Sequence, residues 1–311
     1  MRSRPLEEVK VKSLSKRKGD MYYAMALTLP AVILALLFIF IPIIDSVIKS
    51  FQDYKVRNII GNIPGEWNNF ENYTKIFQSG ALPNAVVNTF SFVILVILCQ
   101  FVLGMALALV LNSNVKFSRF FRSIMMTPWV VPTVISALIW MWLFQPQYGL
   151  FKFLVDFFTG GRVTDFAMLN NPSTALLGVS IAALWKQIPL MTLLLLAGLQ
   201  NVPTDILEAA TIDGAGSVRK FFKITLPYLS PVVKVSVSMS IIENFKQFPL
   251  FWTMTGGGPD GATTNLAILS YREAFVSMNM GSGAAVTTIW MALMIITIGV
   301  YNKLFRTQDL T

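Results

Sequence analysis

The sequence contains no histidine and only one cysteine, Cys99, among its 311 residues. A disulfide within the chain is therefore impossible, and so is a metal cluster built from histidine and cysteine. Catalytic mechanisms that need an imidazole are excluded as well. Cys99 lies inside an apolar run, which favours a small packed hydrophobe over a reactive thiol.

Charged residues are also scarce. They make up 13% of the chain, whereas soluble domains carry about 25%. Hydrophobic residues reach 54%, and the mean hydropathy is +0.61. This composition excludes a disordered or collagen-like chain and predicts a protein whose apolar surface faces a bilayer. The net charge of +9 does not require nucleic acid as a partner.

Six apolar segments are long enough to cross a membrane, which takes about 20 residues in a helix. No segment alternates with a period of two, so the sequence predicts an all-α membrane protein with six spans rather than a barrel. Pro128 and Pro132 should kink the third span. The predicted spans are Tyr22–Ile44, Ala85–Leu111, Phe120–Phe144, Thr174–Leu199, Leu226–Phe251 and Ala284–Asn302.

Basic residues are distributed unevenly between the two sides that six spans would define. One side, which holds both termini, carries fifteen lysines and arginines, and the other carries seven spread over longer loops. The positive-inside rule places the richer side, and hence both termini, in the cytoplasm. We expect a basic tail at 1–21, a six-helix transmembrane domain at 22–306 and a short tail at 307–311. The external loops should be Asp45–Asn84, Gln145–Ser173 and Trp252–Gly283.

The loop at 200–225, between the fourth and fifth spans, is the most informative part of the chain. Asn201 or Thr204 can cap a short helix, and glycine can end that helix at Gly214 because it tolerates a positive φ. The helix presents Glu208, Ala209 and Ala210, one charge beside two methyl groups. On physical grounds alone, an amphipathic helix lying on the membrane is the favoured explanation of this pattern.

The same loop carries a longer motif. Glu208-Ala209-Ala210 is followed at fixed spacing by Gly214, Ile224, Leu226 and Pro227. This pattern resembles the EAA loop of permease subunits in binding-protein-dependent ABC importers. The third span is similar to that family at Arg122, Pro128, Pro132 and Trp140, and Thr255–Thr264 resembles a loop of its carbohydrate-type members. The resemblance runs from about Tyr22 to Arg306.

The resemblance implies a type I importer fold and a division of labour among subunits. Glu208, Ala209, Ala210, Asp213 and Gly214 would form a cytoplasmic coupling helix that docks on a separate ATPase dimer. ATP and Mg²⁺ would be bound by that ATPase, with no cofactor on this chain, which has no GxxxxGK[ST] loop. The other implied partners are a second, different permease chain, an extracytoplasmic solute-binding protein and membrane lipid, in a bacterial inner membrane.

Polar residues inside the spans are candidates for the solute path, because charge within a membrane must face a bundle interior or water. They are Trp185, Lys186, Glu243, Asn244, Lys246 and Gln247. Such groups could offer hydrogen bonds to a carbohydrate-like solute. A buried Glu–Lys pair, a lysine satisfied by backbone carbonyls and an aromatic used for packing remain open as structural explanations.

We therefore expect a permease subunit for a sugar or a related polyhydroxylated solute, with no catalytic residues of its own. The main alternative is an ion-driven secondary transporter, which would not need the EAA loop and often carries an inverted repeat. An integral membrane enzyme would need a nucleophile with a base or paired acids. A membrane scaffold would show no solute-dependent ATPase activity with its partners.

Overall fold

The computed structural model describes residues 13–113, 116–162 and 166–305, so Arg2, Arg4 and the predicted tail at 307–311 lie outside the described residues. Within them, four helices are long and apolar enough to cross a membrane, and two bent helix pairs raise this to six if each pair is one span. The structure therefore confirms a predominantly helical membrane protein. Two of the predicted spans are bent pairs of helices instead of single helices.

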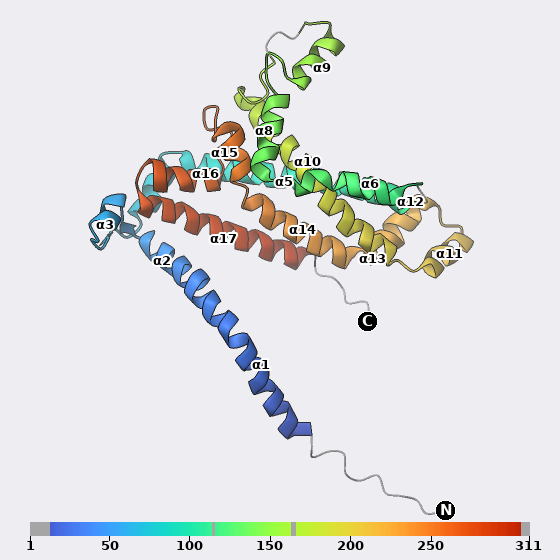
Figure 1. Ribbon diagram of the computed structural model, residues 1–311, viewed down its shortest axis with the longest axis horizontal. Coiled ribbons are helices and arrows are strands. Elements are labelled where there is room, and N and C mark those ends of the chain that lie inside the picture. Colours follow the sequence, from blue (N-terminus) through green and yellow to red (C-terminus); the bar gives the residue numbers. More distant parts are fainter. Residues whose placement is uncertain (1–12, 114–115, 163–165, 306–311) are drawn as a thin grey trace, which may run out of the picture.

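Four helices run side by side as the bundle in Figure 1: α5 (Ala81–Asn112), α10 (Pro172–Gln200), α14 (Ser230–Phe245) and α17 (Met280–Leu304). α10 packs along α5, and the absence of a side chain at Gly104 allows this, because a Cβ there would lie 2.8 Å from Met191 Cγ. The main core is apolar, with Phe92 and Phe245 fully buried. The predicted second, fourth and sixth spans agree with α5, α10 and α17 to within a few residues.

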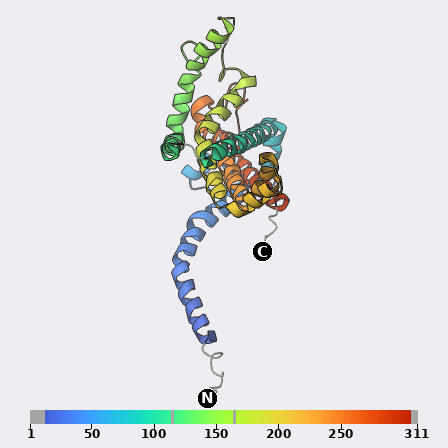
Figure 2. The ribbon, with the colours of Figure 1, turned by 90° about the vertical axis from the view of Figure 1, so that its right-hand side faces the viewer.

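The first span leaves the bundle. It consists of α1 (Ser13–Ala35), a π-helical segment η1 (Leu36–Phe40) and α2 (Ile41–Lys49), and is longer than the predicted Tyr22–Ile44. None of its most apolar stretch is buried inside the chain. α2 packs on α17, but α1 points away from the bundle, on the side opposite α8 (Figure 1 and Figure 2).

The third span is broken rather than kinked. α6 (Ser118–Met125) and α7 (Thr127–Val130) meet α8 (Thr133–Leu143) with a bend of 94°. Pro132 explains the break: the residue before a proline is excluded from helical conformation, and Val131 accordingly has ψ +132°. The segment predicted at Phe120–Phe144 is therefore not one continuous helix but a pair of helices joined by a sharp bend.

The fifth span is also interrupted. α12 (Ser217–Lys220), a π-helical η2 (Phe221–Thr225) and α13 (Leu226–Tyr228) meet α14 with a bend of 69°. α14 ends at Phe245, and Pro249 begins the separate helix α15 (Pro249–Thr255). The predicted helix Leu226–Phe251 was too long, because Pro249 starts a new helix instead of continuing the old one.

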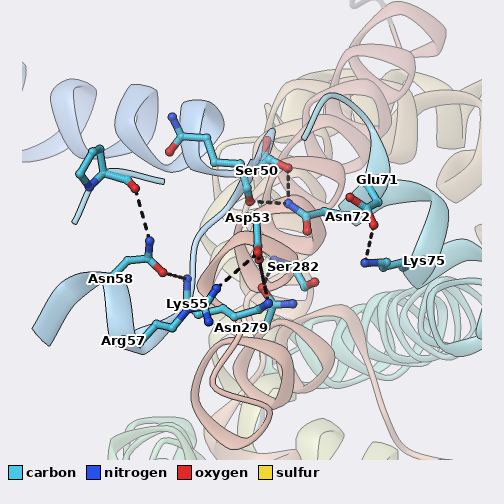
Figure 3. Close-up of polar contacts among 12 residues, drawn as sticks. Ser50, Asp53, Lys55, Arg57, Asn58, Glu71, Asn72, Lys75, Asn279 and Ser282 are labelled. Atoms are coloured by element: carbon cyan, nitrogen blue, oxygen red, sulfur yellow. Dashed lines mark hydrogen bonds and ion pairs between the residues drawn. The ribbon is translucent and has the colours of Figure 1, made fainter. Parts of the chain in front are cut away.

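The predicted external loops are largely structured. A two-residue antiparallel pairing of β1 (Gln52–Asp53) with β2 (Glu66–Trp67) departs from the all-α prediction. Asn72 Nδ2 holds this hairpin by donating to the carbonyls of Ser50 and Gln52, each at 2.9 Å (Figure 3). The other elements of these loops are α3 (Val56–Ile60), α4 (Glu71–Gln78), α9 (Leu150–Thr159), α16 (Leu266–Tyr271) and the π-helical η3 (Arg272–Val276).

The hairpin packs against the start of α17 so closely that only glycine fits. A Cβ on Gly281 would lie 2.3 Å from the Gln52 carbonyl oxygen, and the Gly281 N–H donates to the Tyr54 carbonyl at 2.8 Å. We expect Gly281→Ala to destabilise the purified protein by about 1–3 kcal/mol, because a rigid backbone must shift. Thermal unfolding in detergent measures the effect.

Gly299 lies in the same helix and provides the matched control, since a Cβ there meets nothing within 4 Å. Gly299→Ala should leave the melting temperature unchanged or raise it, because alanine favours helix by about 1 kcal/mol over glycine. Equal effects of the two variants would contradict the close packing at Gly281.

Candidate functional site: a polar groove and a short loop helix

A groove of about 380 Å³ lies among α5, α7, α8, α10 and α14, at the break in the third span. Trp129 and Thr133 flank that break, and α14 supplies polar residues to the opposite wall. The lining residues are Gln100, Trp129, Thr133, Lys186, Gln187, Leu190, Met191, Leu194, Ser236, Met239, Ser240, Glu243 and Gln247.

An amide network joins three of the helices at this groove. The Gln187 and Asn244 amides hydrogen bond to each other in both directions, at 3.0 and 3.1 Å. Ser240 Oγ donates to Gln100 Oε1 at 2.7 Å, and Gln100 Nε2 donates to the Gln187 carbonyl at 3.3 Å. Asn244 is 1% exposed, so it needs these bonds. The network fixes α5, α10 and α14 relative to one another.

Lys186 reaches across the groove to the broken helix end. Its ammonium donates to the carbonyls of Trp129, at 3.2 Å, and of Val131. The last carbonyls of a helix have no partners within it, and a cation at that end is also favoured by the helix dipole. The sequence left open whether Lys186 is satisfied by carbonyls, and the structure answers that it is.

Glu243 and Lys246 form an ion pair of 2.9 Å at the end of α14. Their side chains are 64% and 52% exposed, so the buried pair considered from sequence is wrong. The reason is the early end of α14, where Lys246 is already the C-cap residue. An exposed pair of this kind contributes little to stability.

The structure thus brings three of the six candidate path residues to the groove wall, namely Lys186, Glu243 and Gln247. Asn244 and Lys246 do not line the groove. Asn244 belongs to the amide network, and Lys246 contacts the lining residue Glu243. Trp185 packs on the main core, 6.1 Å from Trp140 between ring centroids, and does not line the groove.

Sequence reasoning missed five polar lining residues, Gln100, Thr133, Gln187, Ser236 and Ser240. A signal existed for two of them. Ser236, Ser240 and Asn244 recur at intervals of four and share one face of α14. Gln100 stands alone in an apolar helix, and Thr133 follows the break that Pro132 causes.

The loop between α10 and α14 forms a helix, α11 (Thr204–Ile212), at one end of the bundle (Figure 1). It starts after Pro203 without a side-chain cap, so the capping predicted for Asn201 or Thr204 was wrong. Its end matches the prediction: Gly214 has φ +77°. The Gly214 N–H donates to Thr211 O at 3.0 Å and the Ala215 N–H to Ala210 O at 2.9 Å, a complete Schellman motif.

This cap leaves the motif residues accessible. Glu208, Ala209 and Asp213 are exposed, whereas Ala210 is buried, with 9% of its surface exposed. Lys220 Nζ donates to Thr211 Oγ1 at 3.0 Å and so ties α11 to α12. α11 is therefore a short rigid body with an exposed acidic and methyl surface.

The glycine-rich segment Thr255–Thr264 lies at the other end of the bundle and is fixed on several sides. Arg272 donates to the Gly256 carbonyl at 2.7 Å, and Asn88 of α5 donates to the carbonyls of Gly261 and Thr264, each at 3.0 Å. Burial raises the pKa of the neighbouring Glu273. These bonds make the segment an ordered part of the fold.

The long apolar helices define a polytopic helical membrane protein, and a groove with polar side chains on its wall lies among them. The family described as the binding-protein-dependent transport system inner membrane component matches residues 100–307. This chain belongs to that family, which confirms the resemblance inferred from the EAA motif. The family is one of transport permeases rather than enzymes and does not favour the ion-driven alternative.

Two relatives cover nearly the whole chain. The sulfoquinovosyl glycerol transport system permease protein SmoG of Agrobacterium fabrum is 32% identical over 94% of this chain and 92% of its own length. The trehalose/maltose transport system permease protein MalF of Thermococcus litoralis is 33% identical over 94% and 96%.

A solved structure shares the fold. It is a bacterial ABC transporter involved in the import of the acidic polysaccharide alginate. One of its chains matches with a TM-score of 0.79 and 20% identity, over 96% of this chain and 100% of its own length. A further structure of the alginate transporter, in complex with alginate pentasaccharide-bound periplasmic protein, matches with a TM-score of 0.78 and 20% identity, over 95% and 98%.

The Schellman cap generates a test of the loop helix. Gly214→Ala should cost about 1–2 kcal/mol locally, because an L-residue is strained at φ +77°. Hydrogen–deuterium exchange of the peptide covering 204–216 should accelerate about fivefold or more. Gly216→Ala is the control, because Gly216 has φ −66° and a Cβ there meets nothing within 4 Å. Equal acceleration in both variants would contradict the cap.

Proposed function

We propose that this chain is the transmembrane permease subunit of an ATP-driven importer for a sugar or a related polyhydroxylated solute. The observation that carries the proposal is the polar groove at the broken third span, in a chain whose relatives are named for sugar and sugar-glycerol transport. Amide and hydroxyl groups on the groove wall suit a solute that presents many hydroxyls. The chain would form half of the translocation path.

We propose that α11 is the coupling helix. Its exposed Glu208 and Ala209 would dock in a groove of a separate ATPase dimer, which would bind ATP and Mg²⁺. The Schellman cap at Gly214 and the Lys220–Thr211 bond support a helix that moves as a rigid body. Motion of the ATPase pair could then reach α10 and α14 through the backbone that joins α11 to both.

The other half of the path would come from a second permease, which we propose is a different chain. The resemblance of Thr255–Thr264 to a loop of carbohydrate-type permeases supports this, and the unburied apolar stretch Met21–Lys49 offers a surface for a partner helix. A solute-binding protein would dock on the outer side, where the hairpin of β1 and β2 and the segment Thr255–Thr264 present ordered polar surfaces. Lipid would cover the remaining apolar faces.

We propose that the chain lies in a bacterial cytoplasmic membrane with both termini inside. The excess of lysines and arginines on the side of Arg219, Lys220 and Lys223 supports this orientation. It puts α11 in the cytoplasm and the β hairpin outside. The basic N-terminal tail, 1–21, would serve as a topology anchor.

Purification of the tagged chain from its native membrane tests the function. We expect a second permease and an ATPase to co-purify, with ATP hydrolysis stimulated severalfold by the loaded binding protein. Glu208→Arg and Ala209→Arg should abolish that stimulation and solute uptake, because a bulky cation cannot enter a groove that accepts an acid and a methyl group. Assembly should persist, as both positions are exposed.

Ser217→Arg is the matched control, because it adds the same charge at an exposed position of α12, outside the motif. It should retain stimulation and uptake. If the chain purifies alone and an ion gradient drives uptake without ATP, the importer assignment is wrong. If Glu208→Arg transports normally, the role of α11 is wrong while the importer assignment stands.

A further inference from the structure

The groove has two charged residues on its wall, and each of them is bonded to another part of the chain. α10 contributes Lys186 and α14 contributes Glu243, whereas α5, α7 and α8 contribute only neutral side chains to the lining. Each charge has a partner in the described structure: backbone carbonyls for Lys186 and Lys246 for Glu243. Whether Lys186 or Glu243 can bind a solute therefore depends on how strongly each side chain is bound to its partner within the chain.

The carbonyls at the end of α7 depend on Lys186 for hydrogen-bond donors. Val131 is held in extended conformation by Pro132, so the helix cannot continue and its terminal carbonyls face the groove region without helical partners. In apolar surroundings an unpaired carbonyl is costly. Lys186 supplies two donors and a positive charge to this end, so withdrawing it would leave Trp129 and Val131 unsatisfied.

We propose that Lys186 is a positioning residue that holds the bend between α7 and α8 against α10, and that the groove consequently takes an uncharged, hydroxylated solute. The inference rests on the proposed function and names its substrate class. An anionic group would have to pull Lys186 away from the carbonyls and would also meet Glu243. A neutral sugar needs only the amides and hydroxyls of the wall, such as Gln247 and Thr133.

The experiment uses the complete reconstituted importer with its binding protein, in proteoliposomes. Three matched solute pairs are compared: maltose with maltobionate, trehalose with trehalose 6-phosphate, and glycerol with sn-glycerol 3-phosphate. Binding to the isolated binding protein and ATP-driven uptake are both measured. We expect the neutral member of each pair to be taken up at least tenfold faster than its anionic counterpart when both are bound by the binding protein. Preferred uptake of an anionic member overturns the substrate class.

Variants of Lys186 test the positioning role. Lys186→Met keeps the length of the stem but removes the donors, so the maximal uptake rate should fall about tenfold with KM changed less than threefold. Lys186→Arg restores a cationic donor and should recover most of that rate. A tenfold rise in KM at a normal maximal rate would show instead that the ammonium binds solute, and wild-type behaviour of Lys186→Met would also overturn the proposal.

Lys234→Met is the matched control. Lys234 lies in α14 but does not line the groove, so its replacement should leave both the rate and KM within twofold of wild type. If Lys186→Met does not assemble, the recovery and KM of Lys186→Arg still decide between the two roles. Absence of ATP-driven uptake of every solute by the wild-type complex would count against the importer itself, not against the role of Lys186.

Discussion

Within a bilayer, every backbone carbonyl must find a donor inside the protein, and much of this structure follows from that constraint. Proline removes one donor and disturbs the residue before it. At Pro132 the helix breaks, the chain turns by 94°, and Lys186 from a distant helix satisfies the exposed carbonyls. The groove lies where this broken helix end and its lysine face α14.

The polar residues of the spans hold the helices together and also line the groove. Gln187 and Asn244 pair across α10 and α14, and Gln100 links α5 to both. Buried amides of this kind are favourable only when each finds a partner, so the network requires one relative placement of the three helices. Gln100, Gln187 and Ser240 of this network also line part of the groove, so the same polar side chains both join the helices and face the cavity.

The two ends of the bundle are rigid in different ways. At one end the Schellman cap at Gly214 makes α11 a compact unit joined to the long helices through short connections. At the other end, Arg272 and Asn88 fix the glycine-rich segment, and Asn72 fixes the β hairpin against α17. Both ends of the bundle are therefore ordered parts of the fold.

The sequence by itself determined the membrane class, the approximate position of the apolar segments, the helix end at Gly214 and the family, because these depend on local composition, glycine conformation and short-range spacing. Only the tertiary structure decided that the third and fifth spans break, that Trp185 packs in the core and that Lys186 caps α7. The breaks occur at prolines, but the bend angles and the other two outcomes depend on contacts between segments far apart in the chain, such as Lys186 with Trp129. Which segments approach one another is set by packing of the whole bundle, and no local pattern encodes it.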